Sequence, residues 1–139
     1  MQGFTFEDGE LVHEPFDCIC GRHHESPISR ILVRPGAIND VASVIDDLHL
    51  GSRAVLVSDE NTHAAAGHRV NDLLEASGRS VTCCTFSGDH WVKPDEKAIG
   101  SVMLSMDADT ELLVVVGSGS LTDLTRFVSA RTCVPFVSV

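Results

Sequence analysis

The sequence predicts an α/β protein with a Rossmann-like, mostly parallel sheet that helices cover on both faces. Several short segments are apolar throughout, as in the run Leu-Leu-Val-Val-Val at 112–116. Strands buried on both faces of a sheet have this pattern, without the alternation of half-exposed strands. Segments of about a dozen residues with apolar side chains at helical spacing separate these runs. Strands that alternate with helices indicate right-handed crossovers and therefore a parallel sheet.

The first expected strand is the short apolar run at 30–33, which Pro35 and Gly36 end. A helix is expected next, over residues 38–48, and Gly51 stops it. Its apolar side chains recur at helical spacing: Ile38, Val41, Ala42, Ile45 and Leu48. Together these segments form the first strand-and-helix unit.

The same unit then repeats. A second strand is expected at 54–57 and a third over Ser80 to Phe86, and the helix between them ends at Gly78. The apolar stripe of this second helix is Ala66, Val70, Leu73 and Leu74.

Two further units complete the chain. Pro94 is placed at the first turn of a third helix. The apolar face of that helix is expected to be Ile99, Val102, Met103 and Met106. The clearest strand spans 111–116 and leads into the loop 117–120, after which a fourth helix carries Leu121, Leu124 and Val128. A fifth strand is expected at 135–139.

Composition excludes several classes of function. A chain of 139 residues with 43% apolar and 22% charged residues has the size and composition of one soluble domain. Twenty acidic side chains against ten basic ones give a formal charge of −10, which disfavours nucleic acid as a partner. No apolar stretch approaches the ~20 residues that cross a bilayer, and Glu7 and Asp8 are unlike a signal peptide. We therefore expect a cytoplasmic protein without a membrane span.

The five cysteines are expected to be free thiols, because their number is odd and their spacing is unlike that of a secreted disulfide framework. The stretch from Cys18 to His24 nevertheless contains four potential soft-metal ligands, namely Cys18, Cys20, His23 and His24. Zinc is the alternative interpretation of this stretch. Its spacing differs from a zinc finger and no second ligand pair follows, so we predict no metal site.

The loop Gly117-Ser118-Gly119-Ser120 is the strongest candidate for a binding site. It follows the clearest strand and precedes a helix, and ligands of parallel sheets collect at such strand ends. Two glycines allow close approach of the backbone to an anion, and two hydroxyls add hydrogen-bond donors. The loop lacks a dinucleotide fingerprint, because position 122 is Thr, and it lacks the Gly-Lys pair of a Walker loop. A tight turn is the alternative.

Two acidic residues are further candidates. Asp59 stands directly after the second strand, where doubly wound folds place a carboxylate that accepts hydrogen bonds from a ribose. Capping of the following helix would also account for Asp59. Asp123 has a similar double interpretation, since Ser120-Leu-Thr-Asp123 resembles a capping box.

Four segments of the sequence carry a resemblance to a known family: Cys20-Gly-Arg-His23, Asp59-Glu-Asn-Thr62, Lys93-Pro-Asp-Glu96 and Gly117-Ser-Gly-Ser-Leu-Thr-Asp-Leu-Thr-Arg-Phe127. Together they resemble the sn-glycerol-1-phosphate dehydrogenases of the iron-containing alcohol dehydrogenase and dehydroquinate synthase-like superfamily. The resemblance runs from about residue 18 to the end. The superfamily's commoner loop is Gly-Gly-Gly-Ser, and its frequent Lys three residues after the acid is Arg126 here.

The resemblance implies an enzyme of phospholipid metabolism. It would transfer a hydride between NAD or NADP and dihydroxyacetone phosphate, a small phosphate substrate, with a divalent metal (Zn, Ni or Fe). It implies that Gly117, Ser118, Gly119 and Ser120 bind the pyrophosphate, that Asp59 binds the adenosine ribose, and that Asp123 is the catalytic acid near the nicotinamide. Because a carboxylate repels a 2′-phosphate, Asp59 favours NAD.

The domain expectation follows from the same resemblance. Residues 1–27 would be an N-terminal arm and residues 28–139 an NAD(P)-binding domain, cut before a helical domain that supplies the metal ligands. We therefore expect the chain alone to hold the cofactor without metal or turnover, and to self-associate as a homo-oligomer. A glycerol dehydrogenase or another alcohol dehydrogenase of the superfamily is one alternative, and a non-catalytic nucleotide-binding module is another.

Overall fold

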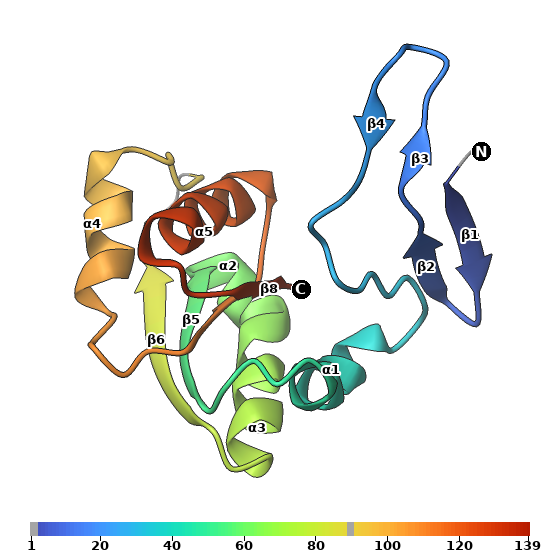
Figure 1. Ribbon diagram of the computed structural model, residues 1–139. Helices are drawn as coiled ribbons and strands as arrows, with labels where there is room; N and C mark the ends of the chain where they lie inside the picture. Colours follow the sequence, from blue (N-terminus) through green and yellow to red (C-terminus); the bar gives the residue numbers. More distant parts are fainter. Residues whose placement is uncertain (1–2, 89–90) are drawn as a thin grey trace. The chain divides into compact units, whose positions relative to one another are not determined.

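The computed structural model describes residues 3–88 and 91–139, and the chain forms two compact units (Figure 1). The first unit is Met1–Ala37 and the second is Ile38–Val139. No helix within the described residues has the length and apolar character that crossing a membrane requires.

The first unit contains two antiparallel hairpins. Strands β1 (Phe4–Glu7) and β2 (Glu10–His13) form one of them, and β3 (Phe16–Asp17) and β4 (His23–His24) form the other. The second hairpin is short, since its ladder has two residue pairs.

The expected strand at 30–33 is wrong. Within this segment Leu32 forms one isolated antiparallel bridge to Glu10, and it joins no strand of the parallel sheet. The neighbouring backbone hydrogen bonds run to the same hairpin, from Leu11 N–H to the Ile31 carbonyl and from Val33 N–H to the Gly9 carbonyl. A short apolar run predicts a buried segment whose backbone N–H and C=O groups need hydrogen-bond partners. It does not predict which strand supplies these partners.

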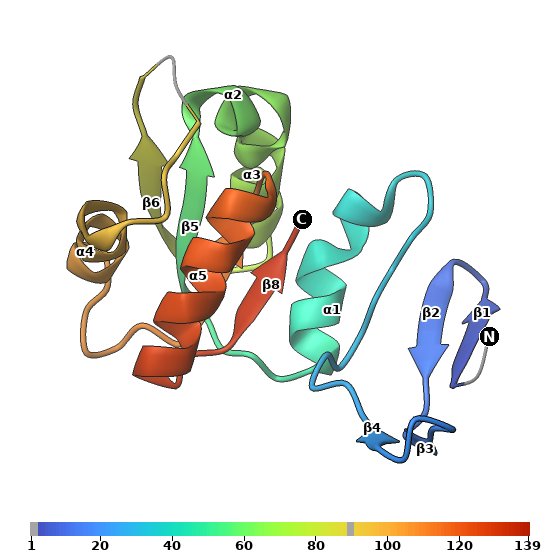
Figure 2. The same ribbon diagram turned by 90° about the horizontal axis from the view of Figure 1, so that it is seen from above.

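The second unit has the predicted parallel sheet, with four strands in the order β6-β5-β7-β8. These strands are β5 (Arg53–Asp59), β6 (Ser80–Phe86), β7 (Leu112–Val115) and β8 (Phe136–Ser138). Every pair is parallel, so the carboxyl ends of all four strands lie at one edge of the sheet. Figure 2 shows this edge at the arrowheads of β5 and β6, with the next helical segment directly beyond β5.

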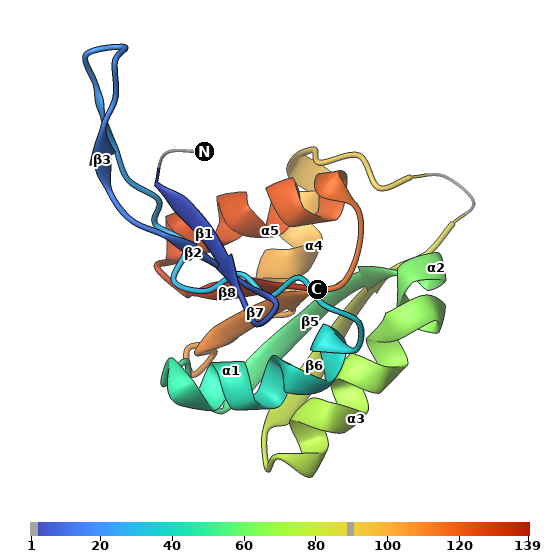
Figure 3. The same ribbon diagram turned by 90° about the vertical axis from the view of Figure 1, so that its right-hand side faces the viewer.

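Helices cover both faces of the sheet, as predicted (Figure 3). On one face α1 (Val41–Asp47) and α3 (His68–Ala76) cover a buried core formed by Val41, Ile45, Ala54, Leu56, Val70, Leu74, Leu112, Val114 and Val116. On the other face α4 (Glu96–Leu104) and α5 (Gly119–Thr132) cover a core of Val55, Val57, Cys84, Ala98, Val102, Leu113, Val115, Leu121, Leu124 and Val128. Successive residues of β5 and β7 alternate between the two cores, which explains why both strands are apolar throughout.

Two helical details differ from the sequence expectation. Pro94 precedes α4 instead of opening it, because Asp95 is the N-cap and its carboxylate accepts a hydrogen bond from the Ala98 N–H at 3.1 Å. Met103 is 49% exposed, since Ala98 and Val102, one helical turn apart, form the buried stripe of α4.

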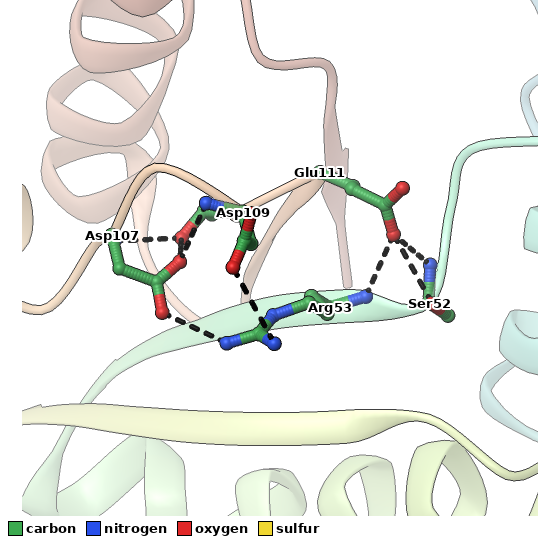
Figure 4. Close-up of polar contacts among 6 residues, drawn as sticks. Ser52, Arg53, Asp107, Asp109 and Glu111 are labelled. Carbon is green, nitrogen blue, oxygen red and sulfur yellow. Dashed lines mark hydrogen bonds and ion pairs between the residues drawn. The ribbon is translucent and has the colours of Figure 1, made fainter.

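Glu111 fixes the start of β7 against the start of β5 (Figure 4). One oxygen of its carboxylate accepts hydrogen bonds from the Ser52 N–H at 2.7 Å, the Ser52 hydroxyl at 3.1 Å and the Arg53 N–H at 3.2 Å. These donors hold the pKa of Glu111 below its usual range. Nearby, the Thr110 hydroxyl first and then other donors, including Arg53, lower the pKa of Asp107.

We expect Glu111→Gln to make the stability of the chain less dependent on pH under acidic conditions. A carboxylate whose pKa is lowered by folding stabilises the fold above its unfolded pKa of about 4.3, and that stabilisation is lost as the pH falls through the folded value. Glutamine keeps one acceptor oxygen and has no such titration. Thermal unfolding at neutral pH and at stepwise lower pH checks this, and parallel profiles for the two proteins would contradict it.

Candidate cofactor-binding site

The candidate residues gather where the strand order reverses. From β5 the chain crosses to β6 on one side, and it then returns to β7 on the other side of β5. The carboxyl ends of β5 and β7 are adjacent, with Val57 opposite Val115 and the Val116 N–H bonded to the Val57 carbonyl at 2.9 Å. Open α/β sheets bind ligands in the crevice at such a reversal point.

The glycine loop enters α5 directly. Ser118 is the N-cap residue with extended backbone, and α5 begins at Gly119, so part of the predicted loop is already helical. Ser118 forms no capping hydrogen bond through its side chain, and its hydroxyl lies 3.1 Å from the Ser120 hydroxyl. The first N–H groups of a helix have no partners within the helix, and they form a positive end suited to an anion.

The two glycines of the loop differ in their surroundings. Gly117 has a φ of +154°, and a Cβ atom placed there would lie 2.5 Å from Leu121 Cδ1 and 3.3 Å from the Thr62 side chain. A Cβ atom at Gly119 would meet no heavy atom within 4 Å. Gly117 is therefore required by the fold, whereas the fold leaves open space at Gly119.

Asp59 is the N-cap of the helical segment after β5, as the capping alternative predicts. Its Oδ1 accepts a hydrogen bond from the Thr62 N–H at 2.8 Å, and the Thr62 hydroxyl accepts one from the Asp59 N–H at 3.0 Å. This reciprocal pair is a capping box that starts α2 (Glu60–Thr62). The cap fixes the carboxylate of Asp59, which is partly exposed, at the carboxyl end of β5.

Asp123 is not part of a capping box. Because Ser118 is the N-cap of α5, Ser120 and Asp123 both lie within the helix. The Asp123 side chain is 64% exposed and forms an ion pair at 3.1 Å with Arg126, one turn later. An exposed pair at this spacing contributes a few tenths of a kcal/mol.

Sequence reasoning missed the residue that joins the two parts of the site. Thr62 closes the capping box with Asp59, and a Cβ atom at Gly117 would lie 3.3 Å from its side chain, so the glycine loop and the Asp59 cap lie side by side. The pattern Asp-x-x-Thr directly after a strand indicates the cap, but it carries no signal for the contact between Thr62 and Gly117.

A buried polar group below the cap was also missed. The hydroxyl of Ser58, which is fully buried, lies 3.1 Å from His63 Nδ1 and 3.3 Å from the Thr85 hydroxyl. His63 opens a π-helical turn, His63–Gly67, between α2 and α3. A Cβ atom at Gly67 would lie 2.6 Å from the His63 ring, so this glycine gives the ring its space. The contacts hold the start of the helix firmly to β5 and β6.

A protein-family model for iron-containing alcohol dehydrogenases matches residues 32–139. The chain belongs to the iron-containing alcohol dehydrogenase family. The match covers the whole parallel sheet and both parts of the candidate site, and it agrees with the resemblance carried by the glycine loop and the Asp59 segment.

Curated relatives in this family include glycerol-1-phosphate dehydrogenase (NAD(P)+) from Geobacillus stearothermophilus, which is 32% identical over 94% of this chain and 33% of its own length. The enzyme of the same name from Methanosarcina barkeri is 34% identical over 78% of this chain and 30% of its own length. The chain therefore spans about a third of the length of these relatives.

Among solved structures, glycerol dehydrogenase from Schizosaccharomyces pombe matches 73% of this chain and 25% of its own length, with a TM-score of 0.64 and 17% identity. At this identity the match supports the fold alone. The doubly wound α/β fold predicted from the sequence is thus confirmed.

The described residues do not offer the family's divalent metal a place at the crevice. Within residues 3–88 and 91–139, the group of three or more His, Cys, Asp or Glu side chains close enough to share an ion is Cys18, Cys20 and His24, in the first unit. No chemical step at the crevice can therefore be assigned to a metal held by these residues.

Proposed function

We propose that the chain is the cofactor-binding part of an NAD(P)-dependent sn-glycerol-1-phosphate dehydrogenase. The observation that supports this most is the adjacency of two groups at the reversal point of the sheet. These are the open N-terminus of α5 at Ser118 to Ser120 and the fixed carboxylate of Asp59. The sequence similarity to curated glycerol-1-phosphate dehydrogenases supports a small phosphate ester as the class of substrate.

In this proposal the pyrophosphate of the cofactor lies against the first turn of α5. The backbone N–H groups and the hydroxyls of Ser118 and Ser120 donate hydrogen bonds to its oxygens, and the helix dipole stabilises its charge. Gly119 permits close approach, because the space where a side chain would begin is open. Asp59 accepts hydrogen bonds from the adenosine ribose while its Oδ1 still accepts the capping hydrogen bond from the Thr62 N–H at the start of α2.

Asp123 is proposed to act near the nicotinamide. It lies one turn of α5 beyond the pyrophosphate-binding residues, it is exposed, and its ion pair with Arg126 is a surface contact that a bound substrate can replace. Hydride transfer itself is chemistry of the nicotinamide. The chain's own residues bind and orient that cofactor, and we expect no turnover from this chain by itself.

Calorimetric titration of the chain with NADH tests the proposal. We expect saturable binding, with NADPH weaker because its 2′-phosphate meets the Asp59 carboxylate. If neither NADH nor NADPH binds to the chain, the proposal is contradicted.

The matched variant is Asp59→Asn, because asparagine is an equally good N-cap and removes the charge. We expect it to raise the affinity for NADPH relative to NADH by about tenfold, the effect of roughly 1.4 kcal/mol of relieved repulsion. An unchanged ratio of the two affinities would show that Asp59 does not contact the ribose. It would leave the role proposed for the glycine loop untouched.

A further inference from the structure

Three potential metal ligands meet at the tip of the second hairpin of the first unit. The Sγ atoms of Cys18 and Cys20 and a ring nitrogen of His24 all lie within 4.8 Å of one another. Cys20 Sγ is 3.2 Å from His24 Nε2. His24 lies in β4, and Cys18 and Cys20 lie in the turn between β3 and β4, so all three residues come from one hairpin of the first unit.

The turn between the strands brings the two thiols together. The Cys18 N–H donates to the Arg22 carbonyl and the Gly21 N–H donates to the Cys18 carbonyl, both at 2.9 Å, which closes a tight loop. Gly21 has a φ of +80°, a conformation that glycine adopts without strain. Inside this loop the Cys20 N–H points to Cys18 Sγ at 3.5 Å. A backbone N–H directed at sulfur stabilises a thiolate, the form of cysteine that binds metals.

Strand geometry decides which histidine joins the cysteines. In the β3–β4 ladder His24 pairs with Phe16 and His23 pairs with Asp17, so the two histidines point to opposite faces. The His24 ring stacks on Phe16, with 5.3 Å between ring centroids, and faces the thiols. His23 Nδ1 instead contacts the Asp17 carboxylate at 2.9 Å.

We propose that Cys18, Cys20 and His24 form a zinc site. Two sulfurs and one imidazole nitrogen are the ligand types that zinc prefers, and Zn–S bonds of about 2.3 Å place tetrahedral ligand atoms roughly 3.5–4 Å apart. Cys20 Sγ and His24 Nε2 are already closer than this spacing, and the other separations need at most about 1 Å of contraction, which the exposed side chains of Cys20 and His24 can provide. The fourth position faces solvent and takes a water.

The site has a structural consequence. The hairpin has two residue pairs, too few for a stable ladder in water. A metal held from both sides of the turn would join the end of β3 to β4 and order the loop, because the energy of metal binding becomes energy of folding. Sequence reasoning disfavoured this site because it looked for a second ligand pair elsewhere in the chain, whereas the hairpin supplies its third ligand by folding back on itself.

The test is titration of the reduced 139-residue chain with Co²⁺, which reports thiolate ligands by charge-transfer absorption, followed by displacement with Zn²⁺. We expect one equivalent of Co²⁺ to bind with this absorption. Cys20→Ser and His24→Gln should each weaken binding more than 100-fold, beyond the 10–100-fold that outer-shell changes cost. Cys133→Ser, which removes an exposed thiol of the second unit, is the matched control and should change nothing.

A second readout follows the fold of the loop. The peptide bond after Arg22 lies between the ligands, so Zn²⁺ should slow tryptic cleavage there in the wild-type chain and not in Cys20→Ser. Circular dichroism shows whether each variant keeps the α/β unit. Absence of a thiolate band with Co²⁺, or an equal band in Cys20→Ser, would overturn the proposal. The metal titration contains no NADH, and the three ligands lie in the first unit whereas the candidate cofactor site lies in the second, so failure of one proposal is distinguishable from failure of the other.

Discussion

Gly119→Val is expected to abolish NADH binding while the chain stays folded. Valine would place an isopropyl group where the backbone must approach the pyrophosphate, and we expect affinity to fall at least 100-fold, about 2.7 kcal/mol. The fold should tolerate the change, because a Cβ at Gly119 meets nothing within 4 Å. Valine in place of glycine near a helix start changes stability by less than about 1 kcal/mol.

The same substitution at Gly100 is the matched control. Gly100 lies in α4, and a Cβ atom there also meets open space. Gly100→Val should therefore bind NADH as the wild-type chain does, which calorimetry and circular dichroism on all three proteins would show. Undiminished binding by Gly119→Val would place the cofactor elsewhere, and the glycine loop would then be only a turn.

Gly117→Ala, unlike Gly119→Val, is expected to cause a large loss of stability. The new methyl group would lie 2.5 Å from Cδ1 of Leu121, which is fully buried against the sheet. Overpacking a core costs about 1–3 kcal/mol, and a backbone conformation that favours glycine adds about 1–3 kcal/mol, so we expect a total of roughly 2–6 kcal/mol.

Urea unfolding followed by circular dichroism measures this effect. Gly119→Ala is the control, since alanine in a helix with open space should leave stability unchanged or raise it by up to ~1 kcal/mol. Equal stability of the two variants would contradict the distinct roles given to the two glycines. A stabilised Gly117→Ala would show that Leu121 can move at little cost.

The strands were predictable where burial alone determines the pattern. Residues 54–57 and 112–115 lie in strands between two helical layers, so both faces must be apolar, and their sequences predict this directly. The segment 30–33 is also largely apolar, but its backbone bonds to a hairpin of the first unit. Three apolar residues in succession cannot distinguish these partners, because pairing over long sequence separations leaves no local signal.

The site was predictable in its parts and less so in their assembly. The glycine loop and Asp59 follow recognisable strands, so their edge of the sheet could be inferred. Helix starts were less certain, because several residues in succession can cap: Ser118 is the cap of α5, not Ser120, and Asp95 rather than Pro94 decides where α4 begins. The contact between Thr62 and Gly117 depends on how two strand ends meet in space.

The strand order also governs how the unit can form during synthesis. β5 is made first among the four strands and lies inside the sheet, and β6 covers only one of its edges. The other edge pairs with β7, whose residues follow β5 by more than fifty positions. A nascent chain therefore carries an apolar strand with an open edge until residues 112–115 have left the ribosome. For that interval a strand from the centre of the finished sheet is exposed to pairing with other chains, and therefore to aggregation.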